Sequence, residues 1–93
     1  MTAFKKGWLL RGTIYSDEGF SVGIEGRSHL VYRSRGKKMT IAGELLANGS
    51  FAGYLVNTKS WDDGTPVATF EQEQIVNNIK RAFASQGQEA DFD

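Results

Sequence analysis

Residues 20–56 read FSVGIEGRSHLVYRSRGKKMTIAGELLANGSFAGYLV, and apolar and polar side chains alternate along much of this stretch. Turn signals interrupt the alternation at Gly26, at Arg35-Gly36 and at Asn48-Gly49. Alternation with a period of two is typical of strands that bury one face. Short runs of this kind, separated by tight turns, predict an antiparallel meander.

The alternation extends back to Trp8, so we expect about five strands in the first sixty residues. The predicted strands are residues 8–15, 20–25, 29–33, 39–46 and 51–56. Asn48-Gly49 is a favoured pair for a two-residue type I′ hairpin turn, which we expect to join the last two strands.

The spacing of apolar residues changes to that of a helix after Thr69. Thr69 and Gln72 fit a capping box at the start of this helix, and Gly87 is placed to end it. One apolar stripe recurs every three to four residues and consists of Ile75, Val76, Ile79, Ala82 and Phe83. Strands followed by one amphipathic helix predict an α+β fold in which the helix packs on the sheet.

The length of 93 residues fits one domain with a modest core. We divide it into strands (1–57), a tryptophan-containing loop (58–68), the helix (69–87) and a short strand or tail (88–93). The large side chains available for the core are Trp8, Phe20, Phe51, Trp61, Phe70 and Phe83.

The composition argues against several kinds of chemistry. Because there is no cysteine, disulfides, thiolate nucleophiles and sulfur-ligated zinc are excluded, and one histidine, His29, cannot form a histidine-rich metal site. No glycine run has the spacing of a phosphate-binding loop. We therefore predict no catalytic residue, metal or cofactor. One enzymatic alternative remains, built on the carboxylates of Glu44, Asp62 and Asp63.

The N-terminus contains no predicted targeting or membrane segment. Its apolar run is interrupted by Arg11 after three residues, whereas a secretory signal needs about 7–15. No stretch approaches the roughly 20 apolar residues of a membrane span. We expect a cytoplasmic protein with no membrane partner.

The net charge is zero, but the charges are unevenly distributed. Residues 1–38 carry eight basic and three acidic side chains, and residues 39–93 carry three basic and eight acidic ones. Within the first segment, Arg33–Lys38 form a basic hairpin. This supports an alternative function as a small nucleic-acid-associated sheet module. The patch is short and the whole chain is neutral, so a solvated hairpin that discourages edge pairing is the favoured interpretation.

Trp61 lies in a loop of serine, aspartate and glycine residues. Such a tryptophan either folds back onto the core or contacts a partner, and we favour the core. Asp62 and Asp63 follow it directly, and capping or turning this loop is their expected role. Glu44 is expected to pair with a basic residue on an adjacent strand.

Residues 26–87 resemble the small immunity proteins of bacterial polymorphic-toxin and contact-dependent inhibition systems, in particular the Immunity protein 74 family. The resemblance rests on the order and spacing of several short motifs. These are Gly26-Arg27, Tyr32, Gly36-Lys37-Lys38, Ile41, Gly43-Glu44-Leu45-Leu46, Gly49, Phe51, Tyr54, Trp61, Pro66 and a helix of the form Glu-x-x-x-Ile-x-x-x-Ile. The tryptophan-proline loop is longer here than in the family pattern.

The resemblance implies a cytoplasmic binder that neutralises a cognate toxin domain, often a nuclease. It carries over Glu44, Trp61 and Pro66 as family-pattern positions. Independently, we expect acidic side chains to mimic phosphates if the toxin is a nuclease. The predicted partner-binding residues are Glu44, Trp61, Asp62, Asp63, Glu71 and Glu73.

Overall fold

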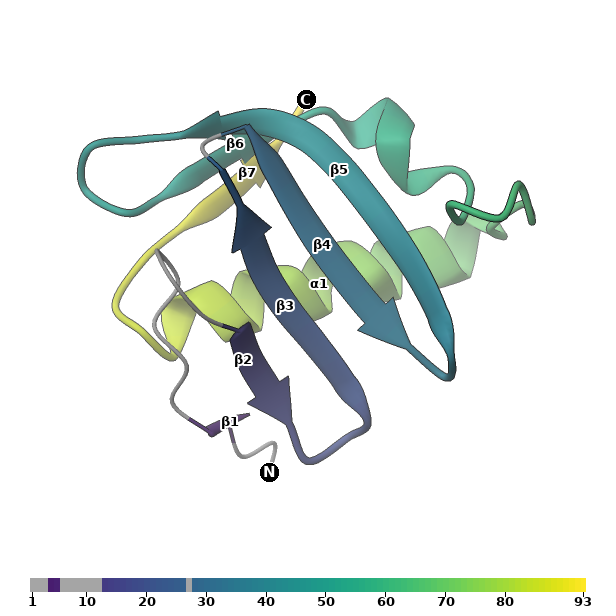
Figure 1. The fold of residues 1–93 in the computed structure, drawn as a ribbon, viewed down its shortest axis with the longest axis horizontal. Coiled ribbons are helices and arrows are strands. Elements are labelled where there is room, and N and C mark those ends of the chain that lie inside the picture. Colours follow the sequence, from purple (N-terminus) through teal and green to yellow (C-terminus); the bar gives the residue numbers. More distant parts are fainter. Residues whose placement is uncertain (1–3, 6–12, 27) are drawn as a thin grey trace.

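The computed structural model describes residues 4–5, 13–26 and 28–93. It has an α+β fold in which one helix crosses one face of a curled sheet (Figure 1). The strands are β1 (Phe4–Lys5), β2 (Thr13–Ser16), β3 (Phe20–Glu25), β4 (His29–Ser34), β5 (Lys37–Leu45), β6 (Phe51–Gly53) and β7 (Ala90–Phe92). The helices are the 3-10 helix η1 (Leu55–Thr58) and the α-helix α1 (Thr69–Ala84).

The strands follow one another across the sheet in sequence order, from β1 to β7. Neighbours from β1 to β6 pair antiparallel, which confirms the predicted meander for these strands. The seven strands exceed the expected five because β1 and the C-terminal β7 add the two edges. β7 pairs parallel with β6, since the chain passes through α1 between them. Trp8, residues 8–12 of the first predicted strand and Arg27 lie outside the described residues.

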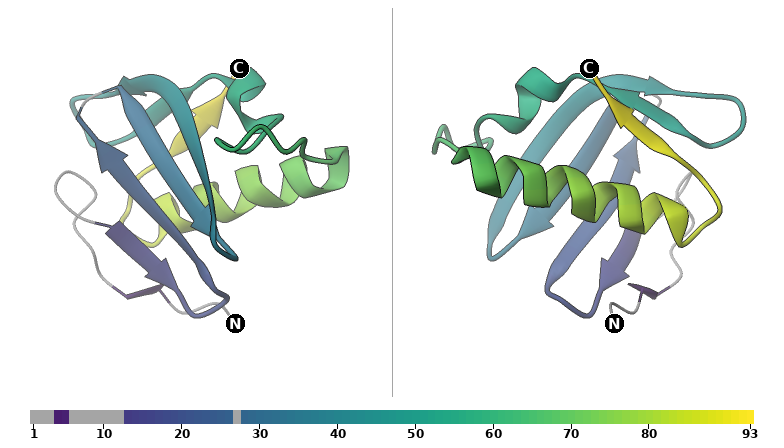
Figure 2. Two further views of the ribbon diagram at one scale, coloured as in Figure 1. Left: turned by 45° about the vertical axis from the view of Figure 1, so that its right-hand side comes forward. Right: turned by 180° about the vertical axis from the view of Figure 1, so that it is seen from behind.

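The core lies between the sheet and α1. Ile14, Val22, Tyr32 and Met39 stand opposite one another on β2 to β5, and all four are buried. The helix covers this face of the sheet, as Figure 2 shows from behind, and it contributes the buried side chains Ile75, Ile79, Ala82 and Phe83. The apolar stripe is therefore confirmed except at Val76, which is only partly buried.

The type I′ turn occurs at a different hairpin from the predicted one. Ser34 and Lys37 pair across a two-residue loop, and both residues of that loop, Arg35 and Gly36, have positive φ (53° and 77°). Positive φ at both positions is the mark of this turn. At Asn48-Gly49 only the glycine has positive φ. The Asn48 Oδ1 instead accepts a hydrogen bond from the backbone N–H of Ser50 at 2.9 Å, within a longer loop.

The predicted capping box is wrong. The N-cap is Ala68, without a side-chain hydrogen bond, and Thr69 is the first helical residue. The Gln72 amide instead donates to the buried Thr58 hydroxyl at 2.6 Å, which ties α1 to η1. The helix ends at Ala84, three residues before the predicted end at 87. Gly87 follows it in a Schellman motif, in which the Gly87 backbone N–H donates to Ala84 and that of Gln88 donates to Phe83.

Two further expectations differ from the structure. The last predicted strand ends at Gly53 rather than at Val56, because the chain turns into η1. Phe70, expected in the core, is 76% exposed. Its position explains this, since it shares the outward side of α1 with the exposed Glu73 and Lys80, away from the sheet.

Candidate functional site

A cleft of about 320 Å³ opens between α1, the tryptophan loop, the start of β3 and the end of β4. Its floor consists of three stacked aromatic rings. The Tyr32 ring lies with its centroid 5.6 Å from that of Phe20 and 6.2 Å from that of Trp61, with interplanar angles of 26° and 29°. All three side chains are buried in the core cluster. We call this feature the Trp61 cleft.

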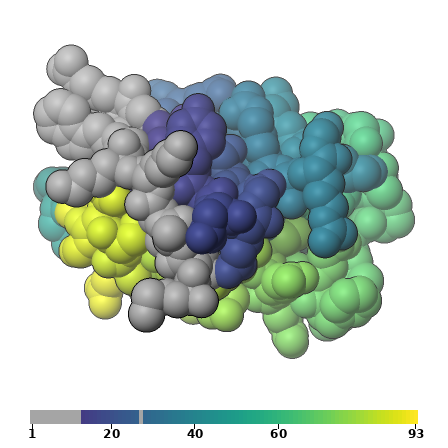
Figure 3. Space-filling model, turned by 90° about the horizontal axis from the view of Figure 1, so that it is seen from below, coloured from purple at the N-terminus to yellow at the C-terminus, as the bar shows by residue number. Residues whose placement is uncertain are grey.

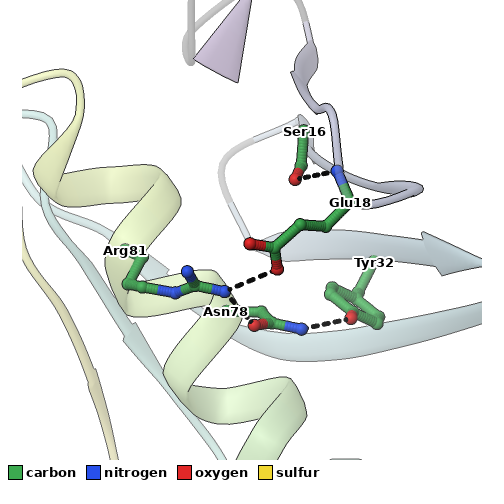
Figure 4. Close-up of polar contacts among 5 residues, drawn as sticks. All are labelled: Ser16, Glu18, Tyr32, Asn78 and Arg81. Carbon is green, nitrogen blue, oxygen red and sulfur yellow. Dashed lines mark hydrogen bonds and ion pairs between the residues drawn. The ribbon is translucent and has the colours of Figure 1, made fainter. Parts of the chain in front are cut away.

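A polar network spans one wall of the Trp61 cleft (Figure 4). The Asn78 amide donates to the Tyr32 hydroxyl at 3.0 Å, and its carbonyl oxygen accepts from Arg81 at 2.6 Å. The same Arg81 nitrogen lies 3.1 Å from a carboxylate oxygen of Glu18, in the β2–β3 turn. This network connects the helix with both the buried floor and the rim of the cleft.

Burial is the main influence on the acidity of Tyr32. It raises the pKa of the hydroxyl, because a phenolate would lose its hydration. Hydrogen bonds with Asn78 and Ser34 and the charge of Arg81 lower the pKa in part. Tyr32 therefore remains neutral at physiological pH. It can offer its hydroxyl to a polar group in the cleft.

The rim of the Trp61 cleft carries both signs of charge. Glu71 and Gln74 project from α1, while Arg35 and Lys37 line the opposite side at the β4–β5 turn. An aromatic floor with a few convergent polar groups is the usual composition of a small binding pocket. The cleft thus suits a side chain or small ligand with one aromatic or planar face and polar edges.

The structure confirms that Trp61 belongs to the core, where 7% of it remains exposed. Asp62 fastens the loop to β5, because its two carboxylate oxygens accept from the Thr40 backbone N–H (2.8 Å) and hydroxyl (2.6 Å). Asp63 accepts from the Thr65 backbone N–H at 2.8 Å. Both aspartates therefore have the structural role that was expected of them.

The pKa of Asp63 is lowered, first by its hydrogen bonds with Thr65 and then by Lys37, whose Nζ lies 3.4 Å away. A carboxylate acting as a general acid would need a raised pKa instead. The enzymatic alternative therefore gains no support at this residue.

The remaining predicted site residues are dispersed. Glu71 lies on the rim of the Trp61 cleft, whereas Glu73 lines a different surface on the other side of α1. Glu44 is exposed on β5, opposite Ala52 of β6. It makes no ion pair with any described residue, so the expected basic partner on a neighbouring strand is not found among them.

A second groove, of about 660 Å³, follows the outward side of α1. Leu55, Phe70 and Val76 provide its apolar surface, and Glu73 and Lys80 lie along it. We call it the Phe70 groove. The sequence pattern did not indicate this groove, because it assigned Phe70 to the core. The residue's place at the very start of the helix, before the apolar stripe, was the available signal.

Asn78 was also missed. It lies on the buried face of α1, one residue before Ile79, and is 8% exposed. A polar residue inside an apolar helical stripe indicates a buried hydrogen-bond network, and here it marks the wall of the Trp61 cleft.

No group of three or more potential metal ligands occurs among residues 4–5, 13–26 and 28–93. Within this part of the chain, no helix combines the length and apolar character needed to cross a bilayer. No family model, no curated protein and no solved structure matches the chain.

Proposed function

We propose that this protein binds and neutralises a bacterial toxin domain by direct protein–protein contact, and that the Phe70 groove is the centre of its binding surface. The observation that supports this proposal most directly is the exposure of Phe70. A phenylalanine with 76% of its surface in water, beside a groove lined by Leu55 and Val76, is costly to leave uncovered.

The chemistry of the groove agrees with a protein partner. Interface cores combine large apolar anchors with a polar rim, and a few buried anchors supply most of the binding energy. Phe70 is such an anchor, and Glu73 and Lys80 are suited to the rim. Val56, on the adjacent η1, adds a further side chain that is 63% exposed.

The toxin as the partner rests on the resemblance of residues 26–87 to immunity proteins. If the toxin is a nuclease, its substrate channel is basic. Glu71 and Glu73, which face opposite sides of the first turns of α1, then offer carboxylates that substitute for phosphates. Asp62 and Asp63 are poorer candidates, because their carboxylates already have partners within the protein. Asp62 accepts a hydrogen bond from Thr40, and Asp63 accepts one from Thr65 and pairs with Lys37.

The proposal is tested with the Phe70→Ala variant and the cognate toxin domain that the proposal requires. Truncating a central anchor costs about 2 kcal/mol or more, so we expect the Kd measured by calorimetry to rise at least about 30-fold. Protection of toxin-expressing cells should fall accordingly. The melting temperature should stay unchanged, because the side chain is exposed.

Tyr15→Ala is the matched control. Tyr15 is another exposed aromatic residue, 57% accessible, but it lies on the opposite face of the sheet from α1. We expect full neutralisation by this variant. Equal toxin affinity of wild type and Phe70→Ala would refute the groove as the binding surface, and failure of the wild type to bind the toxin domain would refute the function.

A further inference from the structure

The face of the sheet turned away from α1 carries a row of side chains that the toxin-binding proposal does not use. Tyr15, Ser21, Arg33 and Lys38 stand directly opposite one another on β2, β3, β4 and β5. They alternate with the buried row of Ile14, Val22, Tyr32 and Met39, so they point to the other face. Tyr15, Arg33 and Lys38 are exposed.

A surface hollow of about 420 Å³ adjoins this row, between the β2–β3 and β4–β5 turns. Figure 3 shows these two turns facing the viewer. The described residues that line the hollow include four cations, Arg33, Arg35, Lys37 and Lys38, and four hydroxyl groups, but no carboxylate. Positive charge and hydroxyl donors without an acid are the composition of a phosphate-binding surface.

Two of these four cations already form ion pairs with carboxylates of the protein, and two do not. Lys37 pairs with Asp63 at 3.4 Å and Lys38 with Asp62 at 3.9 Å, across the tryptophan loop. Arg33 and Arg35 form no ion pair with any described residue. The type I′ turn holds Arg35 at the tip of its hairpin, next to Arg33. Two guanidinium groups therefore remain available to an anion.

We propose that this face binds single-stranded nucleic acid, with the phosphates held by Arg33 and Arg35 and a base stacked on Tyr15. An exposed aromatic ring beside a basic strip is how sheet proteins hold unpaired bases. A duplex offers the same phosphates but keeps its bases stacked internally, so Tyr15 would contribute nothing to binding it. The tyrosine therefore favours the single strand over the duplex.

The binding is tested by fluorescence anisotropy with labelled RNA and DNA strands of mixed sequence, about 12 nucleotides long, within the range of known single-strand sites. Each phosphate contact to a single strand contributes about 0.7 to the slope of log affinity against log salt. We expect a slope of about 1.4, from the two arginines that are not ion-paired. No binding at low salt would overturn the proposal, as would equally tight binding of a duplex of the same length.

The double variant Arg33→Gln/Arg35→Gln should lower the salt slope by about 1.4 and the low-salt affinity at least about tenfold. Lys59→Gln/Lys80→Gln is the matched control, since it removes the same charge from exposed positions elsewhere. If both variants lost the same nucleic-acid affinity, net charge alone would attract the strand. The assignment of the site to Arg33 and Arg35 would then be refuted.

Tyr15→Ala tests stacking, with Tyr54→Ala as its control, because the two tyrosines are equally exposed at 57%. We expect at least about a fivefold loss of affinity for the first variant only. No loss would reject Tyr15 as a stacking platform. Displacement of the oligonucleotide by an equal concentration of inorganic phosphate would indicate a simple anion site and would also overturn the proposal.

The ion pair with Asp63 gives a variant expected to gain affinity. In Asp63→Asn the side-chain oxygen still accepts from the Thr65 backbone N–H, but Lys37 is released. We expect tighter nucleic-acid binding and a steeper salt slope, and weaker binding would contradict the proposal. Phe70→Ala should leave nucleic-acid affinity unchanged. The nucleic-acid proposal and the toxin-binding proposal can therefore be refuted independently of each other.

Discussion

At the scale of single residues, Tyr32 connects more parts of the molecule than any predicted site residue. Its ring is 2% exposed and stacks between Phe20 and Trp61. Its hydroxyl oxygen accepts a hydrogen bond from the side-chain amide of Asn78, a residue that is itself buried. The ring therefore stabilises the core while the hydroxyl satisfies a polar group that would otherwise be costly to bury.

Tyr32→Phe should lower the free energy of unfolding by about 1–3 kcal/mol at neutral pH, because the Asn78 amide loses its acceptor. The folded-state pKa of Tyr32 is raised, so its contribution to stability is fully present below the unfolded-state value of about 10. That contribution is lost as pH rises through the folded-state pKa. Urea unfolding of the variant should thus show a flatter alkaline decline.

The control is Tyr15→Phe, which alters a hydroxyl on the exposed face and should not change the unfolding midpoint at neutral pH. A parallel decline of wild type and Tyr32→Phe above pH ~10 would show that Tyr32 does not cause the alkaline loss.

At the scale of elements, the pairing of β5 with β6 depends on two glycines that stand opposite each other, Gly43 and Gly53. A Cβ added to Gly43 would lie 2.7 Å from the Cα of Gly53 and 2.7 Å from the Phe51 ring, and would overlap the Ala52 carbonyl oxygen. The Phe51 ring covers both glycines and meets Phe83 of α1. This close approach lets β5 and β6 pair with the Phe51 ring packed over them.

Gly43→Ala should destabilise the fold by about 1–3 kcal/mol, because backbone atoms of β6 must move to accommodate the methyl group. Chemical denaturation measures this cost. Gly64→Ala is the comparison, since Gly64 has a φ of 89° but open space around it, so only its backbone conformation is strained. A Gly43→Ala variant as stable as wild type would show that the two strands do not pack this closely.

At the scale of the whole molecule, ion pairs connect the basic part of the chain, residues 1–38, with the acidic part, residues 39–93. The three ion pairs of the described chain are Lys37–Asp63, Lys38–Asp62 and Arg81–Glu18, and each joins residues 1–38 to residues 39–93. Such exposed pairs stabilise little individually. The pairs of Lys37 and Lys38 neutralise charge beside the β4–β5 turn, which leaves Arg33 and Arg35 as its available cations.

The C-terminal strand ties the helix back to the sheet. Backbone N–H groups of Phe51 and Leu55 donate to Glu89 and Asp93 at 2.9 and 2.8 Å, and the Asp93 N–H donates to Gly53 at 3.0 Å. Removing residues 88–93 should therefore cost about 2–4 kcal/mol, from the loss of these hydrogen bonds, of the Gln88–Phe83 bond and of the burial of Ala90. Unchanged thermal unfolding of this truncation would contradict the role assigned to β7, and Asp91→Asn, an exposed change, serves as control.

The sequence by itself was sufficient for the α+β class, the antiparallel meander, the buried stripe of α1 and a helix stop close to Gly87. These follow from periods of two and 3.6 residues and from local backbone preferences. It also indicated the core position of Trp61 and the loop role of Asp62 and Asp63.

Only the tertiary structure decided the parallel pairing of β7, the exposure of Phe70, the Asn78 network and the cross-strand row that holds both Tyr15 and Arg33. Each depends on which residues face one another across strands or across the helix–sheet interface. That register is set by the packing of the whole core, and no local pattern in the chain contains it.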